Sequence, residues 1–277
     1  MSTESNPGNP PSAPAATPAA AADADPAVAG RLRMVLVGTQ HPGNIGSAAR
    51  ALKTMGLARL VLVAPEKAPN AESSALAAGA DDLLEAADRF DTLAEAVADC
   101  RLVLGCTARS RRVPLEELLP HDAAIRAVAA AGEGAEVALV FGRERTGLDN
   151  DELQLCHAAV HIPANPGYSS LNLAAAVQVL AYELRLALLA GGGSGMPMTV
   201  PATPRDGSAS HAQLEGMFAQ FGETLDAIDF HKGRAPESAM RKLRRLFLRA
   251  GLDEREVRLI RGILSDAQRM AMLAGRR

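Results

Sequence analysis

Short apolar runs rich in β-branched residues alternate with helical patterns from residue 31 to about residue 190. This alternation constrains the fold more than any other feature. The apolar runs are MVLVG (34–38), RLVLVA (59–64), RLVLGC (101–106), VALVFG (137–142) and AVHIP (159–163). Helices are predicted between them over 44–55, 71–78, 92–98, 115–130 and 149–156. Such a pattern favours an α/β fold, a mostly parallel sheet with helices on both faces.

A long apolar helix and a separate helical unit are predicted after the sheet. The segment SLNLAAAVQVLAYELRLALLA (170–190) is apolar almost all round, so it is either deeply buried or packed on another subunit. By composition, residues 191–210 form a linker and residues 211–277 a small all-helical extension. Residues 1–30 are Ala/Pro-rich, and we expect a disordered tail before a domain that spans 31–190.

The composition supports a folded core but does not identify a partner. Hydrophobic residues make up 48% of the chain and charged residues 22%. The formal net charge of -3 comes from the tail, because removing Glu4, Asp23 and Asp25 from 32 acids leaves 29 against 29 Lys and Arg. The overall charge therefore gives no indication of an anionic ligand, and local patches must do so.

Several classes of protein are disfavoured by the cysteines and by the apolar runs. The three cysteines include no CxxC pair, which argues against a disulfide framework or a zinc site. Cys156, His157 and His161 lie close together, but their spacing fits no familiar metal motif, so we expect no metal. No run suits a membrane span or a signal peptide, and we expect a cytoplasmic protein without membrane contact.

Three polar loops follow predicted strands: CTARSRR (106–112), GRERTGL (142–148) and ANPGYSSLNL (164–173). Ligands of open parallel sheets bind beyond the carboxyl ends of the strands. Each loop alone could be an ordinary polar turn, and Ser169 or Ser170 could simply cap the following helix. Together with the loop after the first strand, these segments predict a single ligand cleft.

The loop after the first strand is TQHPGNIGSAAR (39–50), in which a glycine-spaced turn leads into a helix of small residues that reaches Arg50. This layout allows close approach to an anionic ligand, but it also occurs at any tight strand-to-helix turn. Arg50 could also be a surface arginine paired with a carboxylate. The glycines do not have the G-x-G-x-x-G spacing of a dinucleotide-binding domain.

A basic segment lies in the predicted helical extension. ESAMRKLRRLFLRAG (237–251) places Met240, Leu243, Phe247 and Ala250 on one helical face, with arginines and lysine on the others. Between positions 234 and 261 there are nine Lys or Arg and four Asp or Glu. The segment could contact RNA phosphates or could be a solvated helix face.

Several segments of the chain resemble the trefoil-knotted RNA 2′-O-ribose methyltransferases of the SPOUT class. These are NIGSAAR (44–50), TARSR (107–111), LVFGRERTGL (139–148) and NPGYSSLNLAAAVQVLAYELR (165–185). The most similar branch acts on the ribose of cytidine or uridine at position 32 of the tRNA anticodon loop. The resemblance implies a parallel sheet with a C-terminal trefoil knot, S-adenosylmethionine as methyl donor without a metal, tRNA as substrate, and a homodimer in which each subunit completes the other's site.

The resemblance also assigns roles to individual residues. It implies that Arg50 is catalytic and that Asn44 shapes the site; since arginine is a poor general base, we expect Arg50 to hold an RNA phosphate and orient the ribose hydroxyl. The implied methyl-donor residues are Cys106, Thr107, Ala108, Gly142, Glu144, Ile162, Ser169, Ser170 and Leu171. The expected RNA-binding residues are Arg109, Arg111, Arg241, Lys242, Arg244 and Arg245.

Two alternatives remain open at this point. The enzyme could methylate another tRNA ribose or ribosomal RNA, because the donor motifs do not determine the substrate. A non-catalytic RNA-binding protein could also keep this fold, and the expected sign would be loss of Arg50 or of the donor loops. Both are present in this sequence.

Overall fold

A seven-stranded sheet organises the chain. The computed structural model describes residues 24–108, 115–191, 207–232 and 235–275. The strands lie in the order β3-β2-β1-β6-β4-β7-β5, and every neighbouring pair is parallel. They are β1 Leu32–Val37, β2 Arg59–Val63, β3 Asp88–Phe90, β4 Leu102–Cys106, β5 Glu116–Leu118, β6 Val137–Phe141 and β7 Ala158–Val160. The predicted parallel α/β sheet is confirmed.

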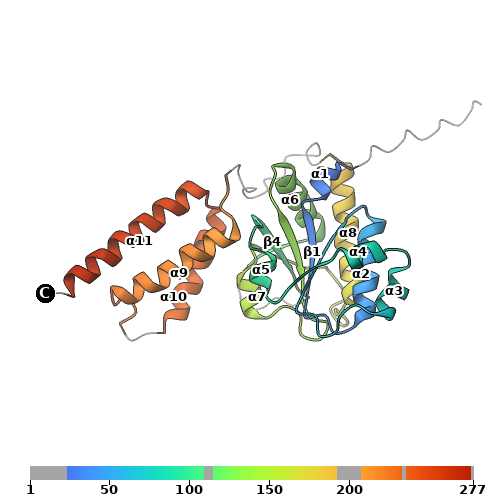
Figure 1. Cartoon of the computed structure of the whole chain (residues 1–277), viewed down its shortest axis with the longest axis horizontal. Helices are drawn as coiled ribbons and strands as arrows, with labels where there is room; N and C mark the ends of the chain where they lie inside the picture. The colour runs from blue at the N-terminus through green and yellow to red at the C-terminus, as the bar shows by residue number, and fades with distance from the viewer. Residues whose placement is uncertain (1–23, 109–114, 192–206, 233–234, 276–277) are drawn as a thin grey trace, which may run out of the picture.

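Helices cover both faces of the sheet (Figure 1). The helices on one face are α1 Pro26–Ala29, α2 Pro42–Thr54, α3 Ala71–Ala77, α4 Asp81–Glu85, α6 Pro120–Gly132 and α8 Leu173–Leu189. Of these, α3 packs mainly on α2. The other face packs on α5 Leu93–Ala96 and α7 Asn150–Gln154.

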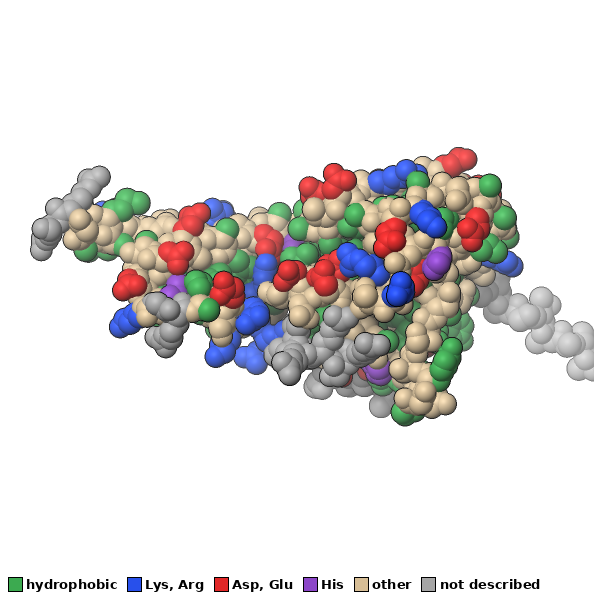
Figure 2. Space-filling model, turned by 90° about the horizontal axis from the view of Figure 1, so that it is seen from below, with side chains coloured by type: hydrophobic (Ala, Val, Ile, Leu, Met, Phe, Trp, Pro, Cys, Tyr) green, Lys and Arg blue, Asp and Glu red, His purple; other side chains and the backbone are tan. Residues whose placement is uncertain are grey.

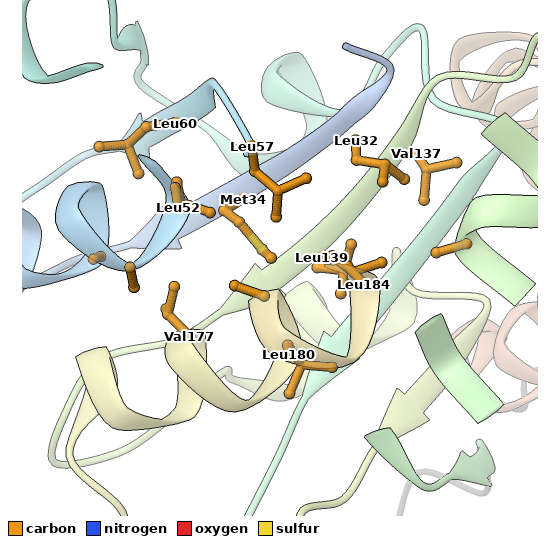
Figure 3. Packing of buried hydrophobic residues seen from close by; sticks show 14 of the residues in the cluster. Leu32, Met34, Leu52, Leu57, Leu60, Val137, Leu139, Val177, Leu180 and Leu184 are labelled. Atoms are coloured by element: carbon orange, nitrogen blue, oxygen red, sulfur yellow. The ribbon is translucent and has the colours of Figure 1, made fainter. Parts of the chain in front are cut away.

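The strands are buried on both sides because their residues alternate between two cores. Met34 and Leu36 of β1 point into the first core, where Figure 3 shows Met34 among leucines of the neighbouring helices. Val35 and Val37 point into the second core. This period of two explains why the strands are continuous apolar runs rather than alternating ones.

The order of the strands places β7 between β4 and β5, although both precede it in the chain. The last strand therefore enters the sheet between two strands that come earlier in sequence. This arrangement is compatible with the C-terminal knot implied by the resemblance, and the knot itself stays a prediction.

Two predicted helix boundaries were wrong. The segment 115–130 begins as the edge strand β5, and α6 starts only at Pro120, a residue favoured in the first helical turn because it lacks an N–H. The long helix α8 begins at Leu173 rather than at residue 170, because Asn172 is its N-cap and accepts from the N–H groups of Ala174 and Ala175. Ser169 and Ser170 therefore do not cap it.

The helical extension consists of α9 His211–Ala227, α10 Pro236–Ala250 and α11 Glu254–Ala274, which lie to one side of the sheet domain, residues 24–191 (Figure 1). Its core contains Leu214, Met217, Phe218 and Val257. Of the predicted apolar face of α10, Met240 and Phe247 pack on this core, whereas Ala250 is exposed. Across the described ranges, no helix combines the length and the apolar character needed to cross a membrane.

Main-chain hydrogen bonds join the extension to the sheet domain. The N–H groups of His211 and Ala212 donate to the carbonyls of Cys100 and Ala98, each over 3.0 Å. Residues 207–210, placed in the predicted linker, are structured: Ser208 pairs with Asp253, and Ser210 caps α9. The short helix α1 likewise lies inside the predicted tail, and residues 1–23 lie outside the described ranges.

Candidate active site at the carboxyl ends of the strands

A cavity of about 160 Å³ lies where β4, β6 and β7 end and α8 begins. Phe141, Val160, Leu173 and Ala176 contribute to its apolar lining. Its lining includes all nine residues expected to bind the methyl donor: Cys106, Thr107, Ala108, Gly142, Glu144, Ile162, Ser169, Ser170 and Leu171. The three loops thus meet at one site, as the parallel topology requires.

Gly142 allows the loop after β6 to fold back on itself. A Cβ at this position would lie 2.1 Å from the nitrogen of Leu148 and 2.2 Å from the carbonyl carbon of Gly147. The turn is closed by a 2.7 Å bond from the Gly147 N–H to the Arg143 carbonyl. Glycine is required here for the close approach of two backbone segments.

Two charged residues of this loop, Arg143 and Glu144, pair outside it and not with one another. Arg143 forms an ion pair of 2.9 Å with Glu152 of α7. Glu144 accepts hydrogen bonds from the main-chain N–H groups of Gln40 (2.9 Å) and His41 (3.2 Å). The side chain of His41, the N-cap residue of α2, forms no capping hydrogen bond. Glu144 instead accepts hydrogen bonds from main-chain N–H groups at the start of this helix.

Asn44 connects Glu144 to the start of α8. Its Nδ2 donates to Glu144 Oε1 over 2.9 Å, and its Oδ1 accepts from Asn172 Nδ2 over 3.0 Å. Asn172 also caps α8 through its Oδ1. Sequence reasoning did not single out Asn172; its position directly before the apolar run of α8 could have identified it as the cap.

Burial acts to raise the pKa of Glu144, but the hydrogen bonds from Asn44 and from the N–H groups of Gln40 and His41 outweigh burial and hold the pKa below its usual value. The carboxylate is therefore ionised at neutral pH. A negative charge at the N-terminus of α2 also suits the helix dipole.

Arg50 lies on α2 and is exposed, but it does not line the cavity of its own chain. Its side chain has no ion pair or hydrogen bond within the described ranges, so it is not the carboxylate-paired surface arginine considered from the sequence. The single chain brings Asn44 and Glu144 together and leaves Arg50 apart from them.

Cys106 and His161 are two further polar residues at or beside the site. Burial raises the pKa of the Cys106 thiol, which keeps it neutral. His161 Nδ1 lies 3.3 Å from the Thr107 carbonyl and so contacts the backbone of the loop after β4. Among the described residues, no three His, Cys, Asp or Glu side chains are grouped as a metal site would need.

Comparison with known families matches residues 31–182 to the SpoU rRNA Methylase family, and residues 212–276 to the C-terminal domain of the tRNA methyltransferase TrmJ. The chain belongs to the SpoU methylase family. The two matched segments correspond to the sheet domain and the helical extension.

This SpoU family member is similar in sequence to curated TrmJ proteins. It is 46% identical to tRNA (cytidine/uridine/adenosine-2′-O-)-methyltransferase TrmJ of Pseudomonas aeruginosa, over 87% of this chain and 95% of the relative. It is 48% identical to tRNA (cytidine/uridine-2′-O-)-methyltransferase TrmJ of Escherichia coli K12, over 86% and 95%. The crystal structure of TrmJ from Z. mobilis ZM4 superposes with a TM-score of 0.71 at 36% identity, covering 84% of this chain and 97% of that one.

The expected RNA-binding residues of this SpoU methylase fall into three groups. Arg109 and Arg111 lie outside the described residues. Arg241 and Lys242 are exposed on α10, and Arg245 is half-buried. Arg244 pairs with Glu215 of α9 and stacks 4.7 Å above the ring of Phe218, so its guanidinium is engaged inside the helical extension.

Proposed function

We propose that the chain is an S-adenosylmethionine-dependent tRNA 2′-O-ribose methyltransferase that acts on cytidine or uridine at position 32 of the anticodon loop. We further propose that it works in the cytoplasm as a homodimer. The observation that carries the proposal is the cavity at the ends of β4, β6 and β7, whose lining includes every residue that the resemblance assigns to the methyl donor. The tRNA 2′-O-methyltransferase activity named for the TrmJ relatives supports the same reaction class.

The residues of the cavity suit S-adenosylmethionine. Phe141, Val160 and Ile162 offer an apolar wall for an adenine ring. The hydroxyls of Ser169, Ser170 and Thr107, and main-chain groups of the same loops, offer hydrogen bonds to a ribose and to an amino-acid end. When bound there, S-adenosylmethionine supplies a methyl group on a positively charged sulfur.

Glu144 has a positioning role in this proposal. Although it lines the cavity, its carboxylate already accepts three hydrogen bonds from the segment 40–44. It holds Asn44 and the start of α2 against the donor loops. Asn44, fixed between Glu144 and Asn172, then forms a rigid side of the site.

Arg50 requires a second subunit to reach a donor cavity. Exposed apolar side chains on α8, Tyr182 (49%), Leu186 (41%) and Leu189 (38%), support a dimer interface on this helix, which packs beside α2. A partner seated there would bring Arg50 of one subunit towards the cavity of the other.

In the reaction the ribose O2′ forms a bond to the methyl carbon, the sulfur–methyl bond breaks, and the hydroxyl proton leaves to solvent. Arg50 stays protonated, since its pKa exceeds ~12, and so it holds the adjoining phosphate rather than taking the proton. Fixing the hydroxyl in line with the methyl group can lower the barrier by about 7–11 kcal/mol.

The test is methyl transfer from radiolabelled S-adenosylmethionine to unmodified tRNA transcripts, with Arg50→Ala in parallel. We expect label at position 32 that resists alkaline cleavage and that the variant lacks. The matched family is named for rRNA methylation, so ribosomal RNA is the second substrate to assay. Label on ribosomal RNA alone would replace the tRNA proposal, and binding of the donor without transfer to either RNA would favour a non-catalytic role.

A further inference from the structure

A second, larger cleft lies between the sheet domain and the helical extension. Its volume is about 870 Å³, and α10 forms one wall. The opposite wall includes Arg101, Glu116 and His157, which lie at the amino ends of β4, β5 and β7, together with Arg126 of α6. The donor cavity lies at the other end of these strands, and the five residues of β4 span about 16 Å. The cleft and the donor cavity are therefore separate sites.

The cleft has a large excess of positive charge. Seven Lys or Arg side chains line it, and among the described lining residues Glu116 is the single carboxylate. Glu116 pairs with Arg126 over 2.8 Å, and Arg244 is engaged by Glu215. Figure 2 shows Lys and Arg side chains gathered where the extension meets the sheet domain.

Five cations of the cleft lack a carboxylate partner within the described part of the chain: Arg101, Arg241, Lys242, Arg245 and Arg249. Arg101 comes from the sheet domain and the other four from α10. Like charges that face one cleft repel each other, so the arrangement favours a polyanion that enters between the two domains.

The uncompensated positive charge of the cleft is clearest at Arg245. It is half-buried, and burial lowers the pKa of its guanidinium because no carboxylate compensates its charge. Phe247 is the one Phe, Tyr or Trp of the described lining, and its ring packs on Phe221 within the extension. Cations without free aromatic rings suit a phosphate backbone rather than unstacked bases.

We propose that this cleft binds the phosphate backbone of the substrate RNA at a place distant from the methylated ribose, with Arg101 on one wall and Arg245 on the other. The proposal rests on the proposed function, because it assumes an RNA substrate. It assigns an RNA-binding role to a residue of the sheet domain, Arg101, and it gives Arg244 a structural role in holding α10 on α9.

The test measures the Kd of the full-length protein for unmodified tRNA transcripts by filter binding at several KCl concentrations. The variants are Arg101→Ala, Arg245→Ala and the double variant. Arg255→Ala is the matched control, because Arg255 is exposed on α11, outside the cleft, and likewise lacks an ion pair within the described ranges.

We expect the double variant to raise the Kd about tenfold at 0.1 M KCl and to reduce the slope of log Kd against log salt by about 1.5, since each lost phosphate contact removes about 0.7–0.9. Arg255→Ala should change the Kd less than about twofold. A double variant that binds tRNA as tightly as the control overturns the proposal. If the double variant folds poorly, a second double variant, Arg241→Ala with Lys242→Ala, repeats the test on exposed residues.

The two proposals can fail separately. Wild-type protein that binds tRNA in the cleft but methylates no RNA would leave this proposal standing and remove the proposed function. If the wild-type protein methylates tRNA while the double variant keeps the wild-type Kd and salt dependence, the proposed function stands and the cleft proposal is overturned.

Discussion

Asn44 Nδ2 lies 2.9 Å from Glu144 Oε1, and this hydrogen bond joins residues that are 100 positions apart in sequence. It connects the first turn of α2 to the loop after β6. Because Asn44 also accepts from Asn172, three loops of the candidate site are tied together through two amides and one carboxylate. The arrangement makes the site's geometry sensitive to single isosteric changes.

Replacing Glu144 with Gln should destabilise the protein by about 2 kcal/mol, because an amide cannot accept all three hydrogen bonds that the carboxylate accepts. The pKa of Glu144 is held below its ordinary value of 4.5, so its stabilising effect is present above that pH and is lost as the pH falls through the native pKa. Urea unfolding at pH 7 and at pH 3 would measure the difference, which should shrink at pH 3. Glu85→Gln, at an exposed glutamate of α4, is the control. Equal stability of the two variants at pH 7 would contradict the prediction.

Asn172 performs two tasks that two substitutions can separate. Asn172→Asp keeps an oxygen to cap α8 but loses the Nδ2 that donates to Asn44. We expect its stability to stay within about 0.5 kcal/mol of wild type while methyl transfer falls about tenfold, whereas Asn172→Ala should also lose about 1 kcal/mol of stability with the cap. Thermal melting and the radiolabel assay together measure both effects. If the Asp variant transfers methyl at the wild-type rate, the link to Asn44 has no positioning role.

The sequence predicted the sheet, and it predicted that the polar loops after the strands meet in one cavity, because both follow from patterns that are local. Apolar runs such as VALVFG identify buried strands, and parallel strands bring their carboxyl ends to one edge. The residues that resemble a known family then fall on these loops. The prediction failed over 116–118, because a three-residue edge strand with exposed side chains has no apolar signal.

The roles of two arginines could not be read from sequence spacing. Arg244 and Arg245 are neighbours in one basic segment and line the same cleft, yet Arg244 is engaged by Glu215 of another helix, 29 positions away, and Arg245 has no carboxylate partner among the described residues. Arg50 is present in the expected motif, but the described single chain does not bring it to the cavity. Tertiary pairing decides the role of Arg244, and under the proposed function a second subunit would decide that of Arg50; neither leaves a local pattern.

Gly142→Ala should destabilise the protein by about 3 kcal/mol and abolish binding of the methyl donor. The added Cβ would lie 2.1 Å from the nitrogen of Leu148, so the backbone of the 142–148 loop must move, and this loop lines the cavity. Calorimetric titration with S-adenosylmethionine and urea unfolding would measure the two effects. Gly132→Ala is a matched control, because a Cβ there meets nothing within 4 Å. A Gly142 variant that behaves like this control would show that the loop can relax without cost.

His211 should make the stability of the protein depend on pH in the weakly acidic range. Its side chain is 1% exposed where α9 meets the sheet domain, and neither ring nitrogen has a hydrogen-bond partner among the described residues. Nε2 lies 3.5 Å from Glu215 Oε1, but that carboxylate is already paired with Arg244. Burial, together with the nearby charge of Arg244, lowers its pKa to about 4. The unfolded chain takes up a proton at a pKa of about 6.5 while the native chain does not, so stability present above pH 6.5 is lost as the pH falls towards 4.

Between pH 7.5 and pH 5, this one histidine should account for about 2 kcal/mol of lost stability, since each pH unit below 6.5 contributes about 1.4 kcal/mol. His157, buried nearby with a pKa lowered by burial to about 3, adds a similar loss that persists in a His211 variant. We therefore expect His211→Leu to be as stable as wild type at pH 7.5 and about 2 kcal/mol more stable at pH 5, measured by urea unfolding. The exposed His121 gives the control substitution, His121→Leu, which should keep the wild-type pH dependence. An unchanged pH dependence in His211→Leu would mean that His211 gains a proton without opening the junction between the two domains.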